Sequence, residues 1–323
     1  MNVNLPPLVP PTFESRVNPY TGRCSGKLWD WLEGFISTDA RSWNRMKVAS
    51  PDLASAYAWP DASPDALTEG MKWMCFYFLI DDELERLTST GRYVDLRHSQ
   101  RRFQLILQGF FAKVVAPTAI ECEFAKLWEQ SSSVHPSRWM EELTQSISRW
   151  IESFSPAGEF DASALLSSLD LHRYEEFREV SYGADWIYLF SEASRGEYLA
   201  PTLRDLPQMA SLRKSTSLQI SLTNDLFSAG REFSEGHYLN SIFIVMSQEC
   251  VDFRKAATLM QERVGFWLQN FIEARSLLFS RLPDLGVSGE NELILRRYVK
   301  GLEQVVSGNF NYHCLVRRNE CSY

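Results

Sequence analysis

Helical periodicity runs through nearly the whole chain from Lys27 onward, and this feature restricts the fold more than any other. Apolar residues recur at three- and four-residue spacing, the pattern of a helix with one buried face. The first such group contains Leu28, Trp31, Leu32, Phe35 and Ile36. We find no alternating strand pattern, no internal repeat and no low-complexity tract. The sequence therefore predicts an all-α fold of about ten or more helices.

Turn signals divide the periodic sequence into separate helices. Ser63-Pro64, followed by an acidic residue, is typical of a helix start, and this helix is expected to continue past Ile80. Proline-containing breaks separate the remaining segments. Further helices are expected over 98–115, 119–132, 136–155, 161–182, 185–198, 205–233, 236–247, 250–279 and 289–313.

The N-terminal region differs from the rest of the chain. Residues 1–20 contain five prolines, so we expect residues 1–26 to form an extended arm that lies along the helices. We find no linker long enough to separate two domains. The sequence therefore predicts that residues 1–323 form a single domain.

Charge and cysteine content exclude several classes of protein. The formal net charge is −8 and the basic residues are scattered, which argues against a nucleic-acid partner. The six cysteines include no CxxC pair and indicate neither a zinc site nor a disulfide framework. The N-terminus does not resemble a signal peptide, and the longest apolar run, around residues 73–80, is too short to cross a bilayer. We expect a cytoplasmic protein without stable membrane insertion.

A cluster of carboxylates follows the apolar run that ends at Ile80. Four acidic residues lie within five positions, from Asp81 to Glu85. On a helix Asp81 and Glu85 share one face, and Asp82 lies next to it. Such clustering is unfavourable without a cation, and carboxylate oxygens are ligands that Mg²⁺ prefers. The alternative is a solvated acidic end of a helix.

A second polar group lies in the segment expected to be a central helix. Asn224, Ser228 and Glu232 are spaced at i, i+4 and i+8, so they lie within a stripe of about 80° on one helix face. An amide oxygen, a hydroxyl and a carboxylate form an all-oxygen half-shell that suits Mg²⁺. The alternative is an exposed polar stripe, but the neighbouring Leu222 and Leu226 favour a buried helix.

Together the two groups resemble the DDxx[DE] and N-D-x-x-S-x-x-x-E motifs of microbial class I terpene synthases of the sesquiterpene-cyclase type. Their order and their separation of about 140 residues are also similar to that family. The resemblance implies an all-α bundle around a central cavity. It also implies Mg²⁺-dependent ionisation and cyclisation of a linear isoprenyl diphosphate, with release of diphosphate. The implied ligands of three Mg²⁺ ions are Asp81, Asp82, Glu85, Asn224, Ser228 and Glu232.

The resemblance assigns roles around a further arginine. Arg178 lies 46 residues before Asn224, where the family carries an arginine that senses the diphosphate. Ser181 takes the place where the family often has aspartate. Tyr182 takes the place of the residue whose backbone carbonyl faces the substrate. Gly183 fits the helix break that the family has here. The alternative for Arg178 is a surface ion pair with a neighbouring glutamate.

Three more residues are implied beside the motifs. Arg231 stands where the family usually has lysine, and either cation neutralises diphosphate. Phe76 and Phe78 match aromatic positions five and three residues before Asp81. Aromatic faces stabilise a carbocation through the ring quadrupole without offering a nucleophile. The alternative for both phenylalanines is core packing.

The C-terminal region departs from the family pattern. Tyr312 stands where the family usually has tryptophan. Arg318 retains the arginine of a closing Arg-Tyr pair that is implied to bind diphosphate. Asn319 occupies the place of the tyrosine, and Tyr323 lies too far along the chain to replace it.

Several alternatives remain at this stage. Chain-elongating prenyl synthases carry two aspartate-rich motifs and this chain has one, whereas protonation-initiated cyclases need D-x-D-D and Leu79 precedes Asp81 by two residues. A non-catalytic isoprenoid-binding helical protein is a further alternative. We favour farnesyl diphosphate (C15) as substrate from the size of the chain and the resemblance, with the C10 and C20 diphosphates as alternatives. A homodimer is also left open.

Overall fold

The protein's structure, a computed structural model, describes residues 7–37, 39–154, 169–235 and 237–320, with the side chains of residues 235 and 317–320 excepted. Within these ranges the chain forms α-helices and one short 3-10 helix, η1 (Phe111–Lys113), and contains no strand. The all-α prediction is therefore confirmed. The helices are α1 (Thr21–Ile36), α2 (Ala40–Ala49), α3 (Pro51–Ala58), α4 (Pro64–Ser89), α5 (Tyr93–Leu107), α6 (Ala119–Val134), α7 (Ser137–Ser153), α9 (Leu171–Ser181), α10 (Asp185–Ala193), α11 (Pro201–Arg204), α12 (Pro207–Glu235), α13 (Ser241–Glu249), α14 (Phe253–Ser280) and α15 (Gly289–Glu320).

Capping side chains fix where several helices begin. Ser63 accepts a hydrogen bond from the backbone N–H of Ala66 at the start of α4, and Pro64 is the first helical residue. Thr118 and Glu121 form a reciprocal capping box at the start of α6. Asp252 caps α14 in the same way as Ser63 caps α4. These are the local signals that the sequence carries for helix starts.

The N-terminal arm is shorter than predicted. The described extended segment ends at Tyr20 and α1 begins at Thr21, six residues before Lys27. The prediction of an arm over 1–26 is wrong in its second part, because the glycines and polar residues of 21–26 have low helix propensity and conceal the first turns. The buried Asn18 side chain donates hydrogen bonds to the carbonyls of Trp59 and Ala62 and fixes the end of the arm.

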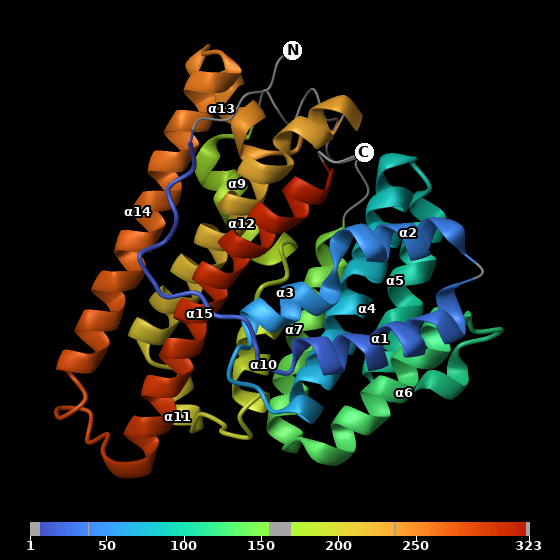
Figure 1. The fold of residues 1–323 in the computed structure, drawn as a ribbon, viewed down its shortest axis with the longest axis horizontal. Helices are drawn as coiled ribbons and strands as arrows, with labels where there is room; N and C mark the ends of the chain where they lie inside the picture. Colours follow the sequence, from blue (N-terminus) through green and yellow to red (C-terminus); the bar gives the residue numbers. More distant parts are fainter. Residues whose placement is uncertain (1–6, 38, 155–168, 236, 321–323) are drawn as a thin grey trace.

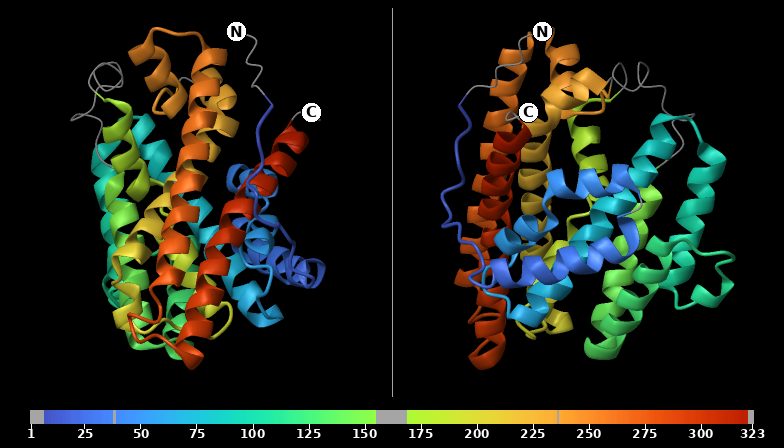
Figure 2. Two further views of the ribbon diagram at one scale, coloured as in Figure 1. Left: turned by 90° about the vertical axis from the view of Figure 1, so that its left-hand side faces the viewer. Right: turned by 45° about the vertical axis from the view of Figure 1, so that its right-hand side comes forward.

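Two layers of helices face each other across the molecule. The long helices α12, α14 and α15 run along one side, and α1 to α6 form the other (Figures 1 and 2). Helix α12 packs against α9, α14 and α15, while α4 packs against α1, α3 and α5. Helix α15 reaches the second layer by packing against α3. A Cβ at Gly308 would lie 2.4 Å from the Tyr57 carbonyl oxygen, so glycine allows this approach.

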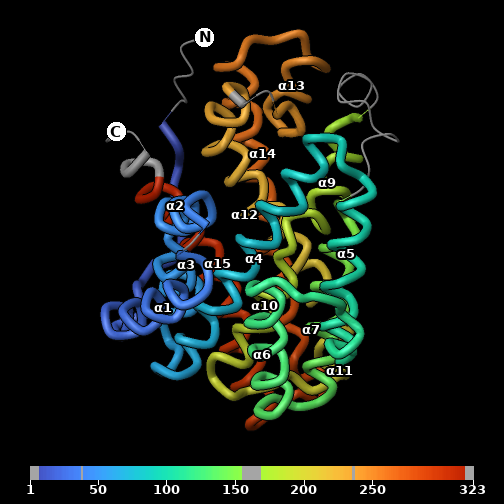
Figure 3. Tube along the Cα trace, turned by 90° about the vertical axis from the view of Figure 1, so that its right-hand side faces the viewer, coloured from blue at the N-terminus to red at the C-terminus, as the bar shows by residue number. Residues whose placement is uncertain are grey.

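The tube drawn in Figure 3 shows α4, α10 and α12 between the helices on either side. This position explains why α4 and α12 carry many buried residues. It also brings the two predicted metal motifs, one on each helix, toward the interior. Among the described helices, none is both long enough and apolar enough to cross a membrane.

Candidate active site

Two adjoining cavities lie between α4 and α12. The outer cavity has a volume of about 570 Å³ and is lined by α2, α4, α12 and α15. The inner cavity, of about 300 Å³, is lined mainly by α3, α4, α9, α12 and α15. These volumes are typical of small-molecule sites. The residues that line both cavities, and so join them, are Phe78, Asp81, Asn224, Arg231, Tyr312 and His313.

The α4 motif places three carboxylates at these cavities. Asp81 lines both, Asp82 lines the outer and Glu85 the inner. Burial, together with the negative charges of Glu85 and Asp82, raises the pKa of Asp81 to about 8. Interaction with His237, whose Nδ1 lies 3.5 Å from Glu85 Oε1, lowers the pKa of Glu85. Asp82 forms an ion pair with Arg45.

The α12 motif presents its three polar side chains to the same cavities. Asn224 lines both, Ser228 lines the outer and Glu232 the inner. Glu232 accepts a hydrogen bond of 2.9 Å from Asn240 Nδ2. Burial and the nearby charge of Asp225 raise the pKa of Glu232.

Two observations indicate that these residues fit a cation. Asp81, Asp82 and Glu85 bring three carboxylates to the same pair of cavities, a concentration of negative charge that a bound cation offsets. Ser228 Oγ is buried beside the Glu232 carboxylate, whose pKa it lowers, so a hydroxyl and a carboxylate oxygen lie together on the cavity side of α12. Within the described residues no group of three or more His, Cys, Asp or Glu side chains forms a preassembled metal cage. Mg²⁺ usually binds one or two carboxylates and completes its shell with water and substrate phosphates, so a split site of this kind suits it.

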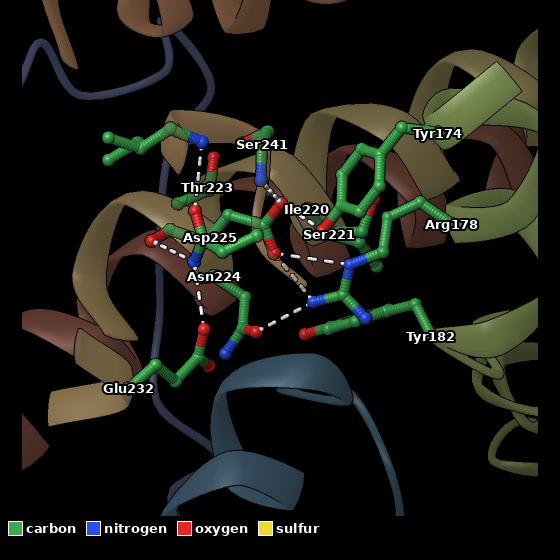
Figure 4. Close-up of polar contacts among 12 residues, drawn as sticks. Tyr174, Arg178, Tyr182, Ile220, Ser221, Thr223, Asn224, Asp225, Glu232 and Ser241 are labelled. Carbon is green, nitrogen blue, oxygen red and sulfur yellow. Dashed lines mark hydrogen bonds and ion pairs between the residues drawn. The ribbon is translucent and has the colours of Figure 1, made fainter. Parts of the chain in front are cut away.

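A buried ion pair braces the α12 motif. Arg178 Nη2 and Nε donate to Asp225 Oδ1 at 2.7 and 3.1 Å, and Nη2 also donates to Asn224 Oδ1 at 3.1 Å (Figure 4). The other carboxylate oxygen of Asp225 accepts hydrogen bonds from the Tyr174 hydroxyl (2.7 Å) and the Ser241 backbone N–H (3.2 Å). Burial alone would lower the pKa of Arg178, but the charge of Asp225 raises it, so the guanidinium stays charged.

The chain bends sharply beside Arg178. Gly183, with φ of +65°, separates α9 from α10, and a Cβ there would lie 2.8 Å from the Trp150 ring. The break turns the Tyr182 backbone carbonyl toward Tyr77, whose hydroxyl donates to it. The Tyr182 hydroxyl donates to Asn309 Oδ1 at 3.2 Å. The break thus joins α4, α9 and α15 around the inner cavity.

The family described as "Terpene synthase family 2, C-terminal metal binding" has a sequence model that matches residues 72–266. This match covers more than half of the chain. The chain belongs to the terpene synthase family. Its enzyme class, a carbon–oxygen lyase that acts on diphosphates, follows from that membership. The metal-binding description agrees with the two oxygen-rich motifs, both of which lie within the matched residues.

Full-length relatives support the assignment. This terpene synthase is 25% identical over 308 residues to (2Z,6E)-hedycaryol synthase of Kitasatospora setae, covering 95% of this chain and 90% of that protein. It is 20% identical to sesquiterpene synthase 3 of Postia placenta, covering 95% and 80% of the two chains. A solved structure of hedycaryol synthase in complex with nerolidol has the same fold, with a TM-score of 0.80 at 22% identity over 96% of this chain and 99% of that one.

Most of the predicted site residues line the two cavities of this terpene synthase. The six predicted metal ligands do so, as do Arg178, Ser181, Tyr182, Phe78, Arg231 and Tyr312. Ser181 Oγ is buried without a hydrogen-bond partner among the described residues. Tyr182 lines the inner cavity, and its backbone carbonyl accepts a hydrogen bond from the Tyr77 hydroxyl. Arg231 Nη2 lies 3.9 Å from Glu232 Oε1.

Phe76 does not line either cavity, which corrects its prediction as a substrate-binding residue. It is 1% exposed and packs in an aromatic cluster with ring-centroid distances of 5.6 Å to Trp31 and 5.1 Å to Phe124. On a helix, position 76 lies about 140° around the axis from position 81. Positions 77 and 78 lie within about 60° of position 81, so Tyr77 and Phe78 face the cavity instead.

The C-terminal helix α15 contributes Tyr312 to the site. Tyr312 lines both cavities, and its hydroxyl donates a hydrogen bond of 2.5 Å to the Ala49 carbonyl at the end of α2. The side chains of Arg318 and Asn319 lie outside the described residues.

Sequence reasoning missed four residues of the site. Tyr174, Asp225 and Asn240 brace the α12 motif. His313 lines both cavities, and burial lowers its pKa to about 4, so the imidazole is neutral at pH 7. The only available signals were local ones: Asp225 follows Asn224 directly, and Tyr174 lies one helical turn before Arg178. Nothing in the sequence marks His313 or Asn240.

Proposed function

We propose that this terpene synthase ionises and cyclises a linear isoprenyl diphosphate, with farnesyl diphosphate as the preferred substrate. The observation that carries this proposal is that the α4 and α12 motifs line the same two cavities. Oxygen ligands and arginines line both cavities, and the inner cavity adds a group of aromatic and aliphatic side chains that includes Tyr77, Ile187 and Ile220. An amphipathic substrate with an anionic head and a hydrocarbon tail matches this combination.

The oxygen-rich side chains of the two motifs would hold three Mg²⁺ ions. When bound, Mg²⁺ supplies Lewis-acid stabilisation of the negative charge on the leaving diphosphate. The proposed ligands are Asp81, Asp82, Glu85, Asn224, Ser228 and Glu232. Arg178 and Arg231 line the inner cavity next to the α12 motif and would bind diphosphate oxygens directly, with Arg318 as a third cation.

The inner cavity would guide the hydrocarbon chain. Tyr77, Phe78 and Tyr182 line it, and their ring faces stabilise positive charge without supplying a strong nucleophile. Ile187 and Ile220 add apolar surface, which keeps water away from the cation. The contour of this cavity, rather than an acid–base pair, would template the folding of the substrate.

The C15 preference rests on the relatives and on size. A relative that matches 95% of this chain is named a sesquiterpene synthase, and sesquiterpenes are C15 compounds. The C10 and C20 diphosphates are the alternatives. We also propose that the enzyme acts in the cytoplasm as a single domain of residues 1–323. Light scattering on the purified protein decides whether it forms a homodimer.

Product analysis tests the proposal directly. The enzyme is incubated with Mg²⁺ and the C10, C15 or C20 diphosphate, and volatile products are identified by gas chromatography–mass spectrometry while released diphosphate is measured. We expect cyclic C15 products and equimolar diphosphate, both abolished by EDTA. Tight binding of farnesyl diphosphate without diphosphate release would support the alternative of a non-catalytic isoprenoid-binding protein.

A further inference from the structure

We propose that one face of α2, formed by Arg41, Asn44 and Arg45, is an additional binding surface for the substrate diphosphate. In this proposal Arg45 moves from Asp82 to a diphosphate oxygen when the ligand enters. The inference rests on the proposed function, because it concerns the same substrate and the same cavities. It adds a basic helix that belongs to neither carboxylate motif.

The first argument is the placement of α2. Arg41, Asn44, Arg45 and Val48 follow the i, i+3, i+4, i+7 spacing of a single helix face, and all four line the outer cavity. Helix α2 packs against α4 and α15, the helices that carry Asp81 and His313 (Figure 1). The basic face is solvent-exposed and borders the outer cavity beside the α4 motif, where Arg45 reaches Asp82.

The second argument is that both ends of α2 are fixed. At its start, Asp39 accepts hydrogen bonds from the backbone N–H groups of Arg41 and Ser42. At its end, the Ala49 carbonyl accepts the Tyr312 hydroxyl. A helix held in this way presents Arg41 and Arg45 without a large ordering cost on binding.

The third argument concerns charge. The outer cavity is lined by Asp81 and Asp82 and by the cations Arg41, Arg45 and Arg231. A carboxylate that turns toward a divalent cation interacts less with its arginine partner. The Arg45 side chain is 44% exposed and Asp82 is 17% exposed, so an exchange of partners by the guanidinium carries a small desolvation cost. A released guanidinium beside a diphosphate forms charge-assisted, often bidentate hydrogen bonds.

The same helix offers a matched control. Lys47 lies about 200° around the helix axis from Arg45, and its Nζ sits 5.0 Å from the centroid of the Trp43 ring. Lys47 does not line either cavity. Replacing Lys47 with glutamine removes one positive charge from α2, as Arg41→Gln and Arg45→Gln do, but at a place that does not face the substrate.

The test measures binding of inorganic diphosphate in saturating Mg²⁺ by isothermal titration calorimetry, with melting temperatures recorded for each variant. We expect Kd to rise about tenfold in Arg41→Gln and in Arg45→Gln, as for the loss of one charge-assisted hydrogen bond, and to change less than twofold in Lys47→Gln. Arg41→Gln keeps the test valid if Arg45→Gln lowers the melting temperature. Equal diphosphate affinity in all three variants overturns the inference.

A second measurement tests whether Arg45 exchanges Asp82 for the diphosphate or only adds positive charge to the cavity. Binding of Mn²⁺ alone is followed by electron paramagnetic resonance. Arg45→Gln frees Asp82 and is expected to strengthen Mn²⁺ binding, whereas Arg41→Gln strengthens it less. Weaker Mn²⁺ binding in Arg45→Gln contradicts the exchange. If the wild-type enzyme neither binds diphosphate nor turns over farnesyl diphosphate, the proposed function fails; if only the α2 variants match the control, this inference alone fails.

Discussion

The α4 motif and the α12 motif line the same cavities, but different surroundings hold them in place. On α12, Asn224 and Glu232 are braced by Arg178 and Asn240, and Arg178 is itself fixed by the buried Asp225. On α4, the carboxylates pair with side chains nearer the surface. Asp82 forms an ion pair with Arg45, whose side chain is 44% exposed, and Glu85 Oε1 lies 3.5 Å from Nδ1 of His237, whose side chain is 35% exposed.

This difference separates a preorganised half of the site from an adaptable half. Groups held by buried hydrogen bonds need little rearrangement to act, whereas groups paired with exposed cations exchange partners at low cost. The side chains of the α12 motif are therefore expected to set the position of the ligand. The α4 carboxylates are expected to change their contacts when the ligand binds.

The largest effect should come from removing a ligand on the preorganised side. Glu232→Gln is expected to lower kcat/KM with farnesyl diphosphate by about 10³-fold, at the upper end for one preorganised stabilising group. Asp82→Asn is expected to cause a loss of kcat/KM about ten times smaller, because Asp82 belongs to the adaptable α4 half of the site. Steady-state kinetics at saturating Mg²⁺ compare the two variants. An equal or larger loss in Asp82→Asn would show that bracing does not determine the contribution of a ligand.

The next largest effect concerns stability. Asp225→Asn leaves the Arg178 guanidinium buried without its counter-charge and should reduce the free energy of unfolding by about 3–5 kcal/mol. Arg45→Gln removes the exposed pair and should reduce it by less than about 1 kcal/mol. Urea denaturation monitored by circular dichroism measures both. Similar values for the two variants would contradict the contrast between the buried and the exposed pair.

His313, which lines both cavities, gives a pH-dependent test. Its pKa is about 4 in the folded protein and near 6.5 in the unfolded chain, so between these values only the unfolded chain binds the proton. Protonation of the unfolded chain therefore lowers the free energy of unfolding as pH falls from 6.5 toward 4, by roughly 2–3 kcal/mol. Above pH 6.5 this loss is absent. The difference in unfolding free energy between His313→Phe and wild type should shrink over this window. A constant difference would mean that His313 is not held neutral by burial.

The smallest effect is expected at the C-terminal departure from the family. Asn319→Tyr restores the Arg-Tyr pair and should change kcat/KM by no more than a few-fold, since a tyrosine hydroxyl adds one neutral hydrogen bond. Arg318→Ala should lower kcat/KM about tenfold or more, because a guanidinium binds two phosphate oxygens at once. If Arg317→Ala has the larger effect, the predicted register is wrong by one residue.

Several parts of the fold were predictable because their signals are local. Ser63 and Pro64 mark the start of α4, and the strong periodicity after Phe253 marks α14. The short α2 and α3 were missed. Helices α2 and α3 have ten and eight residues, too few for a clear period, and half of the residues of α2 are polar. Residues of the predicted helix 161–182 up to 168 lie outside the described residues, and α9 covers Leu171–Ser181.

The site, like the fold, has features with local sequence signals and features that depend on contacts between distant residues. Spacing along each helix placed the residues of each motif on one helix face, the resemblance implied a common cavity, and both motifs line the same two cavities. The Asp225–Tyr174 hydrogen bond joins residues 51 positions apart on different helices, so no local pattern reveals it. The prediction for Phe76 rested on its distance from Asp81 along the sequence, whereas the angular position on the helix brings Tyr77 to the cavity side. The single domain and the number of Mg²⁺ ions stay predictions.

The apolar part of the lining of the inner cavity has a consequence for engineering. Ala54 and Ala58 on α3, Ile187 on α10 and Val305 on α15 line it, and none belongs to a metal motif. Substitutions that change side-chain size at these positions would alter the shape of the cavity around the hydrocarbon chain. They would leave the metal ligands and the arginines unchanged. Product diversity could therefore arise, in the laboratory or in evolution, from a few side chains that contribute nothing to the first chemical step.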